Sequence, residues 1–215
     1  MINAEYIYLH GFASSPQSNK AQYLSDRANQ ETGIKLNVLD LNQGDFTNLT
    51  LTRQIQQTVA AFPNNHTPIT LIGSSFGGLT AAWVAETYPQ VKSLVLLAPA
   101  FGFPTSWLSR LEKAQLRQWQ KSNYLSVYHY GEDRYLPLNY QFVIDANSYD
   151  QSKLNRDLPT LILHGKHDDV VPIEVSRNYA SRHPQTKLME LDSDHGLNDV
   201  KEIIWQEIKT FIDDQ

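Results

Sequence analysis

A serine flanked by glycines is the part of this sequence best suited to chemistry. The segment G-S-S-F-G at residues 73–77 directly follows the apolar run 69–72, and residues 79–88 have the pattern of an apolar helix that ends at Pro89. In a strand-turn-helix of this kind the central serine lies on a strained turn, and glycines on both sides let other segments approach it. The pattern therefore predicts that Ser75 is an exposed nucleophile.

A serine hydroxyl attacks a carbonyl group efficiently only when a histidine takes its proton. His195 is the histidine in the best position, because it follows the expected strand 188–191 and precedes the last expected helix. We interpret three other histidines, which lie in a polar loop, at a helix end and in an expected hairpin, as non-catalytic: His66, His183 and His129. The sequence therefore predicts His195 as the base.

The base in turn needs a carboxylate that fixes its tautomer and stabilises its charge. Asp168 is the predicted acid, because it follows the expected strand 160–163 and precedes a helix that Pro172 can begin. Its neighbour Asp169 is an alternative, and Asp194 is a further carboxylate next to the histidine. The sequence leaves the choice between Asp168 and Asp169 open.

Acyl transfer also requires two backbone N–H groups that bind the oxyanion of the tetrahedral intermediate. The residue after the nucleophile, Phe76, is expected to supply one of them. The segment His10-Gly11-Phe12 follows the first expected strand, and its glycine lets the N–H of Phe12 turn toward the same site. His10 is then expected to brace this loop, and a simple turn at His10-Gly11 is the alternative.

The sequence offers little that would bind a metal or a nucleotide. His164 and His167 are close in sequence, but the chain has no cysteine and no H-E-x-x-H helix, so we expect them to be structural. The glycine-rich run 73–78 lacks the lysine and the spacing of a phosphate loop, and no G-x-G-x-x-G follows the first expected strand. We predict no metal site and no cofactor.

Short β-rich runs alternate with helical patterns along the chain, which is typical of a doubly wound α/β fold with a mostly parallel sheet. Ligands of such folds bind beyond the carboxyl ends of the strands, where every motif above falls. Amphipathic patterns predict core-facing helices at 54–62 and 200–212. The expected strands are 6–9, 36–39, 69–72, 94–97, 160–163 and 188–191.

One long segment, at about residues 101–157, interrupts this alternation. It holds a helical pattern at 107–120 and then two tyrosine-rich runs around G-E-D at 131–133, which predict a hairpin whose second strand is limited to an edge by Pro137. We expect this helix-plus-hairpin insertion to form a lid over Ser75, because it follows the fourth strand. A surface hairpin without a role at the site is the alternative.

Composition narrows the remaining classes of protein. The 215 residues are 41% hydrophobic and no linker divides them, so we expect a single domain, 1–215. The net charge of -5, with acidic and basic residues in mixed order, argues against nucleic acid as a partner. With no signal-peptide pattern, no membrane span and no cysteine, the expected location is cytoplasmic.

Together these motifs resemble those of the α/β-hydrolase superfamily, over essentially the whole chain. The order of Ser75, Asp168 and His195 matches the order of that superfamily's triad. More narrowly, H-G-F-x-S-S at 10–15 and G-S-S-F-G-G at 73–78 resemble the small YqiA/YcfP-type bacterial esterases. The resemblance implies a three-layer sandwich with six mostly parallel strands in the order 2-1-3-4-5-6, without the first two strands of the full superfamily sheet.

The expected reaction is the hydrolysis of carboxylic esters, with short-chain acyl esters as the first expectation, through an acyl-enzyme on Ser75. A thioesterase or acyltransferase with the same triad is an alternative, and so is a non-catalytic binding protein on a hydrolase fold. Phe101 and Phe103 are candidates for an apolar substrate pocket. The expected partner is a small acyl ester, and the tyrosines of the insertion suggest a homodimer face as a further alternative.

Overall fold

A six-stranded parallel sheet forms the centre of the structure, a computed structural model that describes residues 4–64 and 66–215. Its strands are β1 (Glu5–Leu9), β2 (Leu36–Leu39), β3 (Ile69–Ser74), β4 (Val91–Leu97), β7 (Thr160–Gly165) and β8 (Thr186–Leu191). They pair in the order β2-β1-β3-β4-β7-β8, and each pair is parallel. All six predicted strands are present, and most of them are longer than predicted.

The predicted order 2-1-3-4-5-6 differs in detail from the observed order 2-1-3-4-7-8. The difference arises because two more strands, β5 (Tyr124–His129) and β6 (Arg134–Asn139), come between β4 and β7 in the chain and form a separate antiparallel hairpin. Pro137 pairs with Ser126 in this hairpin. A two-stranded sheet has only edge strands, so a proline is tolerated there.

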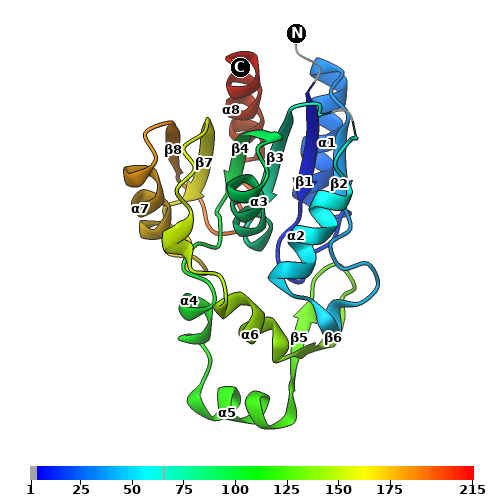
Figure 1. Ribbon diagram of the computed structural model, residues 1–215, viewed down its shortest axis with the longest axis vertical. Coiled ribbons are helices and arrows are strands. Elements are labelled where there is room, and N and C mark those ends of the chain that lie inside the picture. The colour runs from blue at the N-terminus through cyan, green and yellow to red at the C-terminus, as the bar shows by residue number, and fades with distance from the viewer. Residues whose placement is uncertain (1–3, 65) are drawn as a thin grey trace.

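Helices cover both faces of the sheet and complete three layers (Figure 1). One face carries α1 (Asn19–Thr32) and α8 (Lys201–Asp213), which pack against each other and share one apolar cluster with the sheet. The other face carries α2 (Leu51–Ala60), α3 (Phe76–Thr87) and α7 (Glu174–Arg182). Sequence analysis did not predict α1, because only Ala21, Leu24 and Ala28 of its 14 residues are buried and its apolar pattern is weak.

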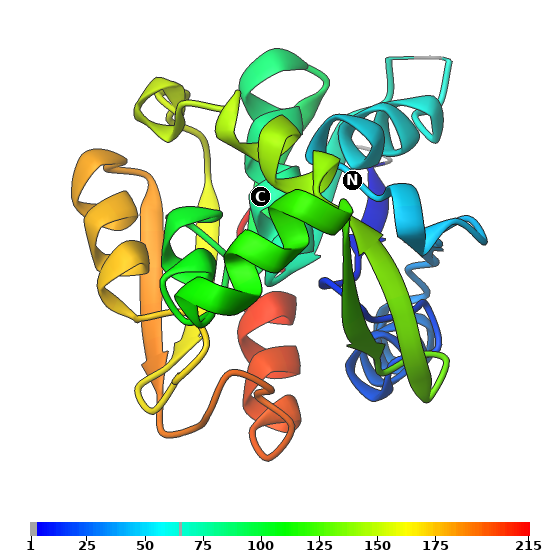
Figure 2. The ribbon, with the colours of Figure 1, turned by 90° about the horizontal axis from the view of Figure 1, so that it is seen from below.

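The segment between β4 and β7 lies across the carboxyl ends of the strands (Figures 1 and 2). It contains α4 (Thr105–Leu108), α5 (Lys113–Ser122), the β5–β6 hairpin, α6 (Gln141–Asn147) and the 3₁₀ turn η2 (Gln151–Lys153). The single helix predicted at 107–120 is wrong, because the chain turns between α4 and α5 and lets Leu111 pack against the core. Trp107 and Trp119 from the two helices meet edge to face at 5.7 Å.

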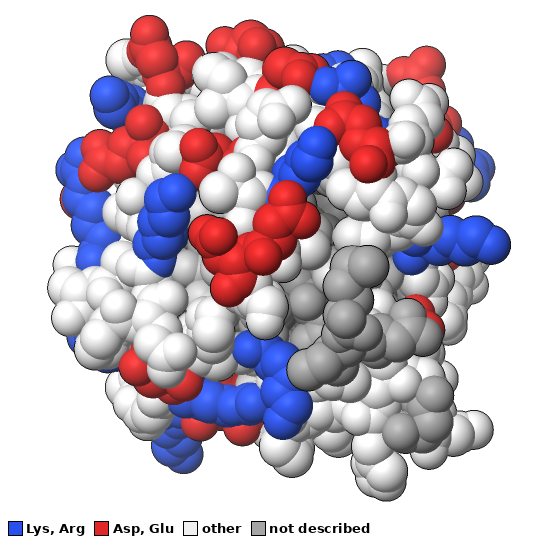
Figure 3. Space-filling view, turned by 90° about the horizontal axis from the view of Figure 1, so that it is seen from above, with Lys and Arg blue, Asp and Glu red and all other residues white. Residues whose placement is uncertain are grey.

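The end of the molecule opposite this segment carries the C-terminus and the start of β1 (Figure 1). On the described part of that face, acidic and basic residues are intermixed and form no continuous basic patch (Figure 3). None of the helices in the described part of the chain is long and apolar enough to cross a membrane. Tyr124, Tyr130 and Tyr135 of the hairpin are exposed, and a homodimer face there stays a prediction.

A buried histidine fixes the hairpin to the rest of the protein. His129 is 1% exposed and meets the ring of Phe46, in the 3₁₀ turn η1 (Phe46–Asn48), edge to face at 4.8 Å. Neither ring nitrogen of His129 has a hydrogen-bond partner among the described residues. Burial therefore lowers the pKa of His129 below its ordinary value of 6.5.

This lowered pKa predicts that acid destabilises the fold. Near neutral pH and below, the unfolded chain binds the His129 proton more readily than the folded chain, so the free energy of unfolding should fall as the pH drops from about 7 to about 5. Thermal unfolding midpoints across this range should depend less on pH in His129→Phe than in the wild type. Part of the dependence should remain, because burial also lowers the pKa of His10. The exposed His66 supplies the control variant His66→Gln, and an undiminished pH dependence in His129→Phe would contradict the prediction.

Candidate active site

Ser75 lies on the turn between β3 and α3, at the carboxyl edge of the sheet. Its φ is 52° and its ψ is -115°, a strained conformation for a residue with a Cβ atom. The N–H of Ser75 donates to the carbonyl oxygen of Leu97 at 2.8 Å, and its carbonyl oxygen accepts from the N–H of Ala100 at 3.0 Å. These bonds tie the turn to the chain that leaves β4 and hold it in the strained conformation.

Two glycines make this turn sterically possible. A Cβ atom on Gly73 would lie 2.5 Å from the carbonyl oxygen of Gly77, and one on Gly77 would collide with the carbonyl oxygens of Leu9 and His10. The start of α3 is therefore in direct contact with the end of β1. This contact is the physical reason for glycine on both sides of the serine.

His195 lies in the loop between β8 and α8 and reaches both other members of the predicted triad. Its Nε2 is 3.0 Å from Oγ of Ser75, and its Nδ1 is 2.7 Å from Oδ2 of Asp168. Asp194 has a different role, because its Oδ1 accepts the N–H groups of Gly196 and Leu197 at 2.8 and 3.2 Å and shapes the loop. Hydrogen bonds thus connect a hydroxyl, an imidazole and a carboxylate from three separate loops.

The turn after β7 separates the two neighbouring aspartates. The side chain of Asp168 is fully buried, and its Oδ1 accepts the N–H groups of Val170 and Val171 at 2.8 and 2.7 Å. Asp169 is exposed. The structure therefore places Asp168, and not Asp169, beside the histidine.

A second histidine supports Asp168 from the side opposite His195. Nε2 of His164 is 3.1 Å from Oδ2 of Asp168 and 3.0 Å from the carbonyl oxygen of Val171, while its Nδ1 is 2.7 Å from Oγ of Ser176. Burial acts to raise the pKa of Asp168, but hydrogen bonds from His164 and His195 outweigh it and hold that pKa well below its ordinary value. The carboxyl group is therefore ionised at neutral pH.

The remaining histidines lie away from the nucleophile. Nδ1–H of His10 donates to the carbonyl oxygen of Gly11 at 2.9 Å and its Nε2 accepts from the N–H of Leu41 at 3.1 Å, so His10 braces its loop. His183 is buried against backbone carbonyl groups, and His66 is exposed in its loop. Nε2 of His167 lies 2.7 Å from Oδ1 of the exposed Asp192. The described residues contain no cluster of three side chains that could hold a metal.

The loop after β1 lies against Ser75. A Cβ atom on Gly11 would be 3.4 Å from Cβ of Ser75. The N–H groups of Phe12 and Phe76 donate no hydrogen bond to any other described residue. Both groups are therefore free to donate to an oxygen bound beside Ser75.

A cleft of about 570 Å³ opens beside Ser75 and His195. Its volume is in the range of small-molecule sites. Phe12 and the tip of the hairpin, Tyr130 and Gly131, form part of its wall, and most of the other lining residues have polar side chains. The N–H of Tyr130 donates to the carbonyl oxygen of Ala13 at 2.8 Å, which fixes the hairpin tip at the cleft.

The polar wall of this cleft was not predicted from the sequence. Ser14, Ser15, Ser18 and Lys20 line it, from the loop after β1 and the first turn of α1. The signal available in the sequence was the run of hydroxyl and amide side chains, ending in a lysine, directly after the predicted oxyanion loop. This run could be interpreted as part of the cleft only once the start of α1 was known.

The two residues predicted to form an apolar substrate pocket do not line this cleft. Phe101 is 5% exposed and stacks on Tyr179 at 4.4 Å. Phe103 is 9% exposed and packs against Phe76 at 5.1 Å. Both rings belong to the core between the sheet and the insertion, and a substrate-binding role for them stays a prediction.

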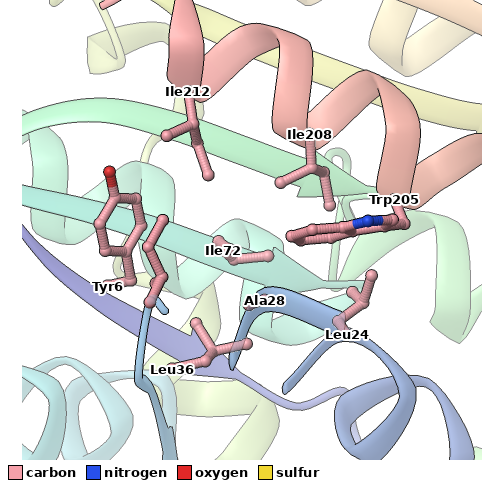
Figure 4. Close-up of a pocket in the computed structure, with 9 residues that line it drawn as sticks. Tyr6, Leu24, Ala28, Leu36, Ile72, Trp205, Ile208 and Ile212 are labelled. Carbon is pink, nitrogen blue, oxygen red and sulfur yellow. The ribbon is translucent and has the colours of Figure 1, made fainter. Parts of the chain in front are cut away.

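A second, much smaller pocket lies between α1, α8 and the sheet (Figure 4). Its walls are almost entirely apolar, with Leu24, Ile72 and Trp205 among them, and its volume is about 10 Å³. A space of this size holds one water molecule at most. We interpret it as a packing gap and not as a ligand site.

The chain matches one protein family in sequence. A family model described as "Uncharacterised protein family (UPF0227)" matches residues 5–213. No curated protein matches the chain in sequence.

Solved structures share the fold at low sequence identity. Alpha/beta hydrolase domain-containing protein 10 from mouse superposes with a TM-score of 0.80 at 19% identity, covering 100% of this chain and 91% of that chain. Est1E from Butyrivibrio proteoclasticus, in a structure with bound ferulic acid, superposes with a TM-score of 0.81 at 21% identity, covering 99% of this chain and 89% of that chain. At these identities the likeness establishes the fold.

Proposed function

Because the chain belongs to the uncharacterised protein family UPF0227, the YqiA/YcfP family within the α/β-hydrolase superfamily, we propose that it is a serine hydrolase that cleaves carboxylic esters. The family resemblance predicted from the sequence is confirmed. The observation that carries the proposal is the hydrogen-bonded series of Ser75, His195 and Asp168 at the edge of a cleft.

In the first half of the proposed reaction, Oγ of Ser75 attacks the acyl carbon while Nε2 of His195 takes the hydroxyl proton. The ionised carboxylate of Asp168 holds Nδ1–H of the imidazole and stabilises its positive charge. The N–H groups of Phe12 and Phe76 donate to the negative oxygen of the tetrahedral intermediate. The C–O bond to the alcohol then breaks, and His195 returns the proton to the departing oxygen.

In the second half, water attacks the acyl group on Ser75 while His195 takes one of its protons. The new tetrahedral intermediate uses the same two N–H groups. It collapses to a carboxylic acid, and His195 gives the proton back to Oγ of Ser75. The enzyme is regenerated without a cofactor, and the products are one alcohol and one acid.

The volume of the cleft favours a small substrate. A volume of about 570 Å³ suits an ester with a short acyl chain better than one with a long chain. We propose that the segment 101–157 serves as a lid, with the hairpin tip at Tyr130 and Gly131 as the part that borders the substrate.

A fluorophosphonate probe tests the proposal directly. The folded protein is incubated with the probe, and the modified residue is located by peptide mass mapping, with Ser75 as the expected site because only an activated serine reacts quickly. In parallel, hydrolysis of 4-nitrophenyl esters from acetate to palmitate is measured, and short acyl chains are expected to give the highest kcat/KM. Comparison with acyl-CoA substrates separates an esterase from a thioesterase.

The two readouts have distinct meanings. A folded protein whose Ser75 does not react with the probe would contradict a serine hydrolase and favour a binding protein on this fold. Labelling of Ser75 with preference for long acyl chains would retain the mechanism and reject the short-chain assignment.

A further inference from the structure

Lys20 is a cation in the candidate active-site cleft that the proposed reaction does not use. It lies in the first turn of α1 and lines the same cleft as Ser75 and His195. Its Nζ donates one hydrogen bond, 3.3 Å long, to Oγ of Ser74, the residue before the nucleophile. The ammonium group is therefore hydrogen-bonded to the residue before the nucleophile, and its side chain borders the cleft in which a substrate would bind.

Within the described residues, this ammonium has no ion-pair partner. The carboxylates that act on it are those of Asp168 and Asp194, and neither is within 4.0 Å. Asp168 is engaged by two histidines, and Asp194 by two backbone N–H groups. Burial of a cation without a close counter-charge destabilises a fold. An anionic ligand in the cleft would supply the missing charge.

The charge of Lys20 persists at neutral pH. Burial lowers the pKa of Lys20 to about 8, against the opposing effect of Asp168 and Asp194. The group is thus mostly protonated at about pH 7. Its partial burial also strengthens an ionic hydrogen bond relative to one in bulk water.

The neighbours of Lys20 add hydrogen-bond donors suited to an anion. Ser14, Ser15 and Ser18 line the same cleft and carry hydroxyl groups, and no acidic residue lies in the first turn of α1. Ser18 at the N-cap makes no side-chain capping bond, so the positive end of this 14-residue helix is not neutralised by its own cap. Lys201 lies beside the rim, where its Nζ donates to Oδ1 of Asn19 at 2.6 Å.

We infer that the cleft binds esters that carry a second, anionic group, a carboxylate, which pairs with Lys20 while the ester carbonyl lies at Ser75. The inference rests on the proposed hydrolase function and names its substrate class. The anionic group can belong to the acyl part or to the alcohol part of the ester.

Two pairs of matched esters test the inference and distinguish these sources. For the acyl side, mono-4-nitrophenyl adipate is compared with its methyl ester; for the alcohol side, 4-butyryloxybenzoate is compared with its methyl ester. Within each pair the bond that is followed is the same aryl ester, and the remote carboxylate is masked as a neutral methyl ester; release of the phenol is measured, so cleavage of the methyl ester is not counted. We expect the wild type to have a kcat/KM at least about 10-fold higher for the anionic member of one pair, as a charge-assisted hydrogen bond predicts.

Substitution of Lys20 tests whether its ammonium group causes the preference for the anionic ester. In Lys20→Met the ratio of kcat/KM for the anionic and neutral esters should fall by about 10- to 100-fold, and Lys20→Arg should restore much of it. Lys92→Met removes the same charge from an exposed position near the start of β4, away from the cleft, and should leave the ratio unchanged. If Lys20 only braced Ser74, both esters would lose activity together and the ratio would stay constant, which would overturn the inference.

Binding to Ser75→Ala gives a readout that does not depend on turnover. The Kd values of the same ester pairs are measured by calorimetry in Ser75→Ala and in Ser75→Ala/Lys20→Met. A preference for the anionic ester that disappears with Lys20 supports the anion site even if the wild type hydrolyses none of them, a result that would reject only the hydrolase proposal. Equal Kd values for anionic and neutral esters in both pairs would reject the anion site.

Discussion

Ser75→Ala is expected to lower kcat/KM for 4-nitrophenyl esters by about 10⁴-fold or more. Among the described residues, the Ser75 hydroxyl is the cleft group that is hydrogen-bonded to His195, and the N–H groups of Phe12 and Phe76 make no other hydrogen bond. Without this hydroxyl no acyl-enzyme can form. The residual rate should be that of water activated weakly by the rest of the site.

The same variant should remain folded. Alanine has the same backbone restrictions as serine at φ 52°, so the strain of the turn is unchanged, and the lost hydrogen bond to His195 changes the free energy of unfolding by only about 1 kcal/mol. Thermal unfolding and kinetics are measured side by side, with the exposed Ser181→Ala as the control for loss of a hydroxyl. Full esterase activity in a folded Ser75→Ala protein would show that the proposed nucleophile is wrong.

The second large effect is expected at Asp168, where Asp168→Asn should lower kcat by about 10³- to 10⁴-fold. Asparagine keeps the size of the side chain but loses its negative charge, so it no longer stabilises the imidazolium form of His195 or selects its tautomer. Because Asp168 is buried away from the cleft wall, KM should change much less than kcat.

Asp169→Asn is the matched control, since it makes the same chemical change one residue later in an exposed side chain. It should have close to wild-type kcat. Asp168 also accepts hydrogen bonds from two backbone N–H groups and contacts His164, so the Asp168→Asn protein is expected to be less stable than the wild type. Circular dichroism should therefore establish the folded fraction before rates are compared. A large loss of kcat in Asp169→Asn with none in Asp168→Asn would reverse the assignment.

The local features of the site could be predicted because they depend on neighbouring residues. The glycines around Ser75 are required by backbone contacts that any such turn makes. The apolar runs that became β3, β4 and β7 are buried on both faces, and continuous burial is what an apolar run indicates. Parallel strands then bring their carboxyl ends to one edge, so motifs after different strands were expected to meet there.

Two features of the fold were not predictable from local pattern. The insertion divides into α4 and α5 because Leu111 packs into a core that the sequence does not reveal. The polar α1 was missed because its few buried residues face α8, which lies far away in the sequence.

The sequence by itself determined the sheet, the sharp turn at Ser75 and the residue types of the proposed triad, since steric demands and apolar periodicity act over a few residues. Only the tertiary structure showed which of Asp168 and Asp169 lies beside His195, because two adjacent side chains in a turn point in different directions and the outcome depends on the backbone of that turn. It also decided that Lys20 lies beside Ser74, a contact across 54 positions of the chain. Such contacts follow from how helices pack on the sheet, and no short segment of sequence specifies that packing.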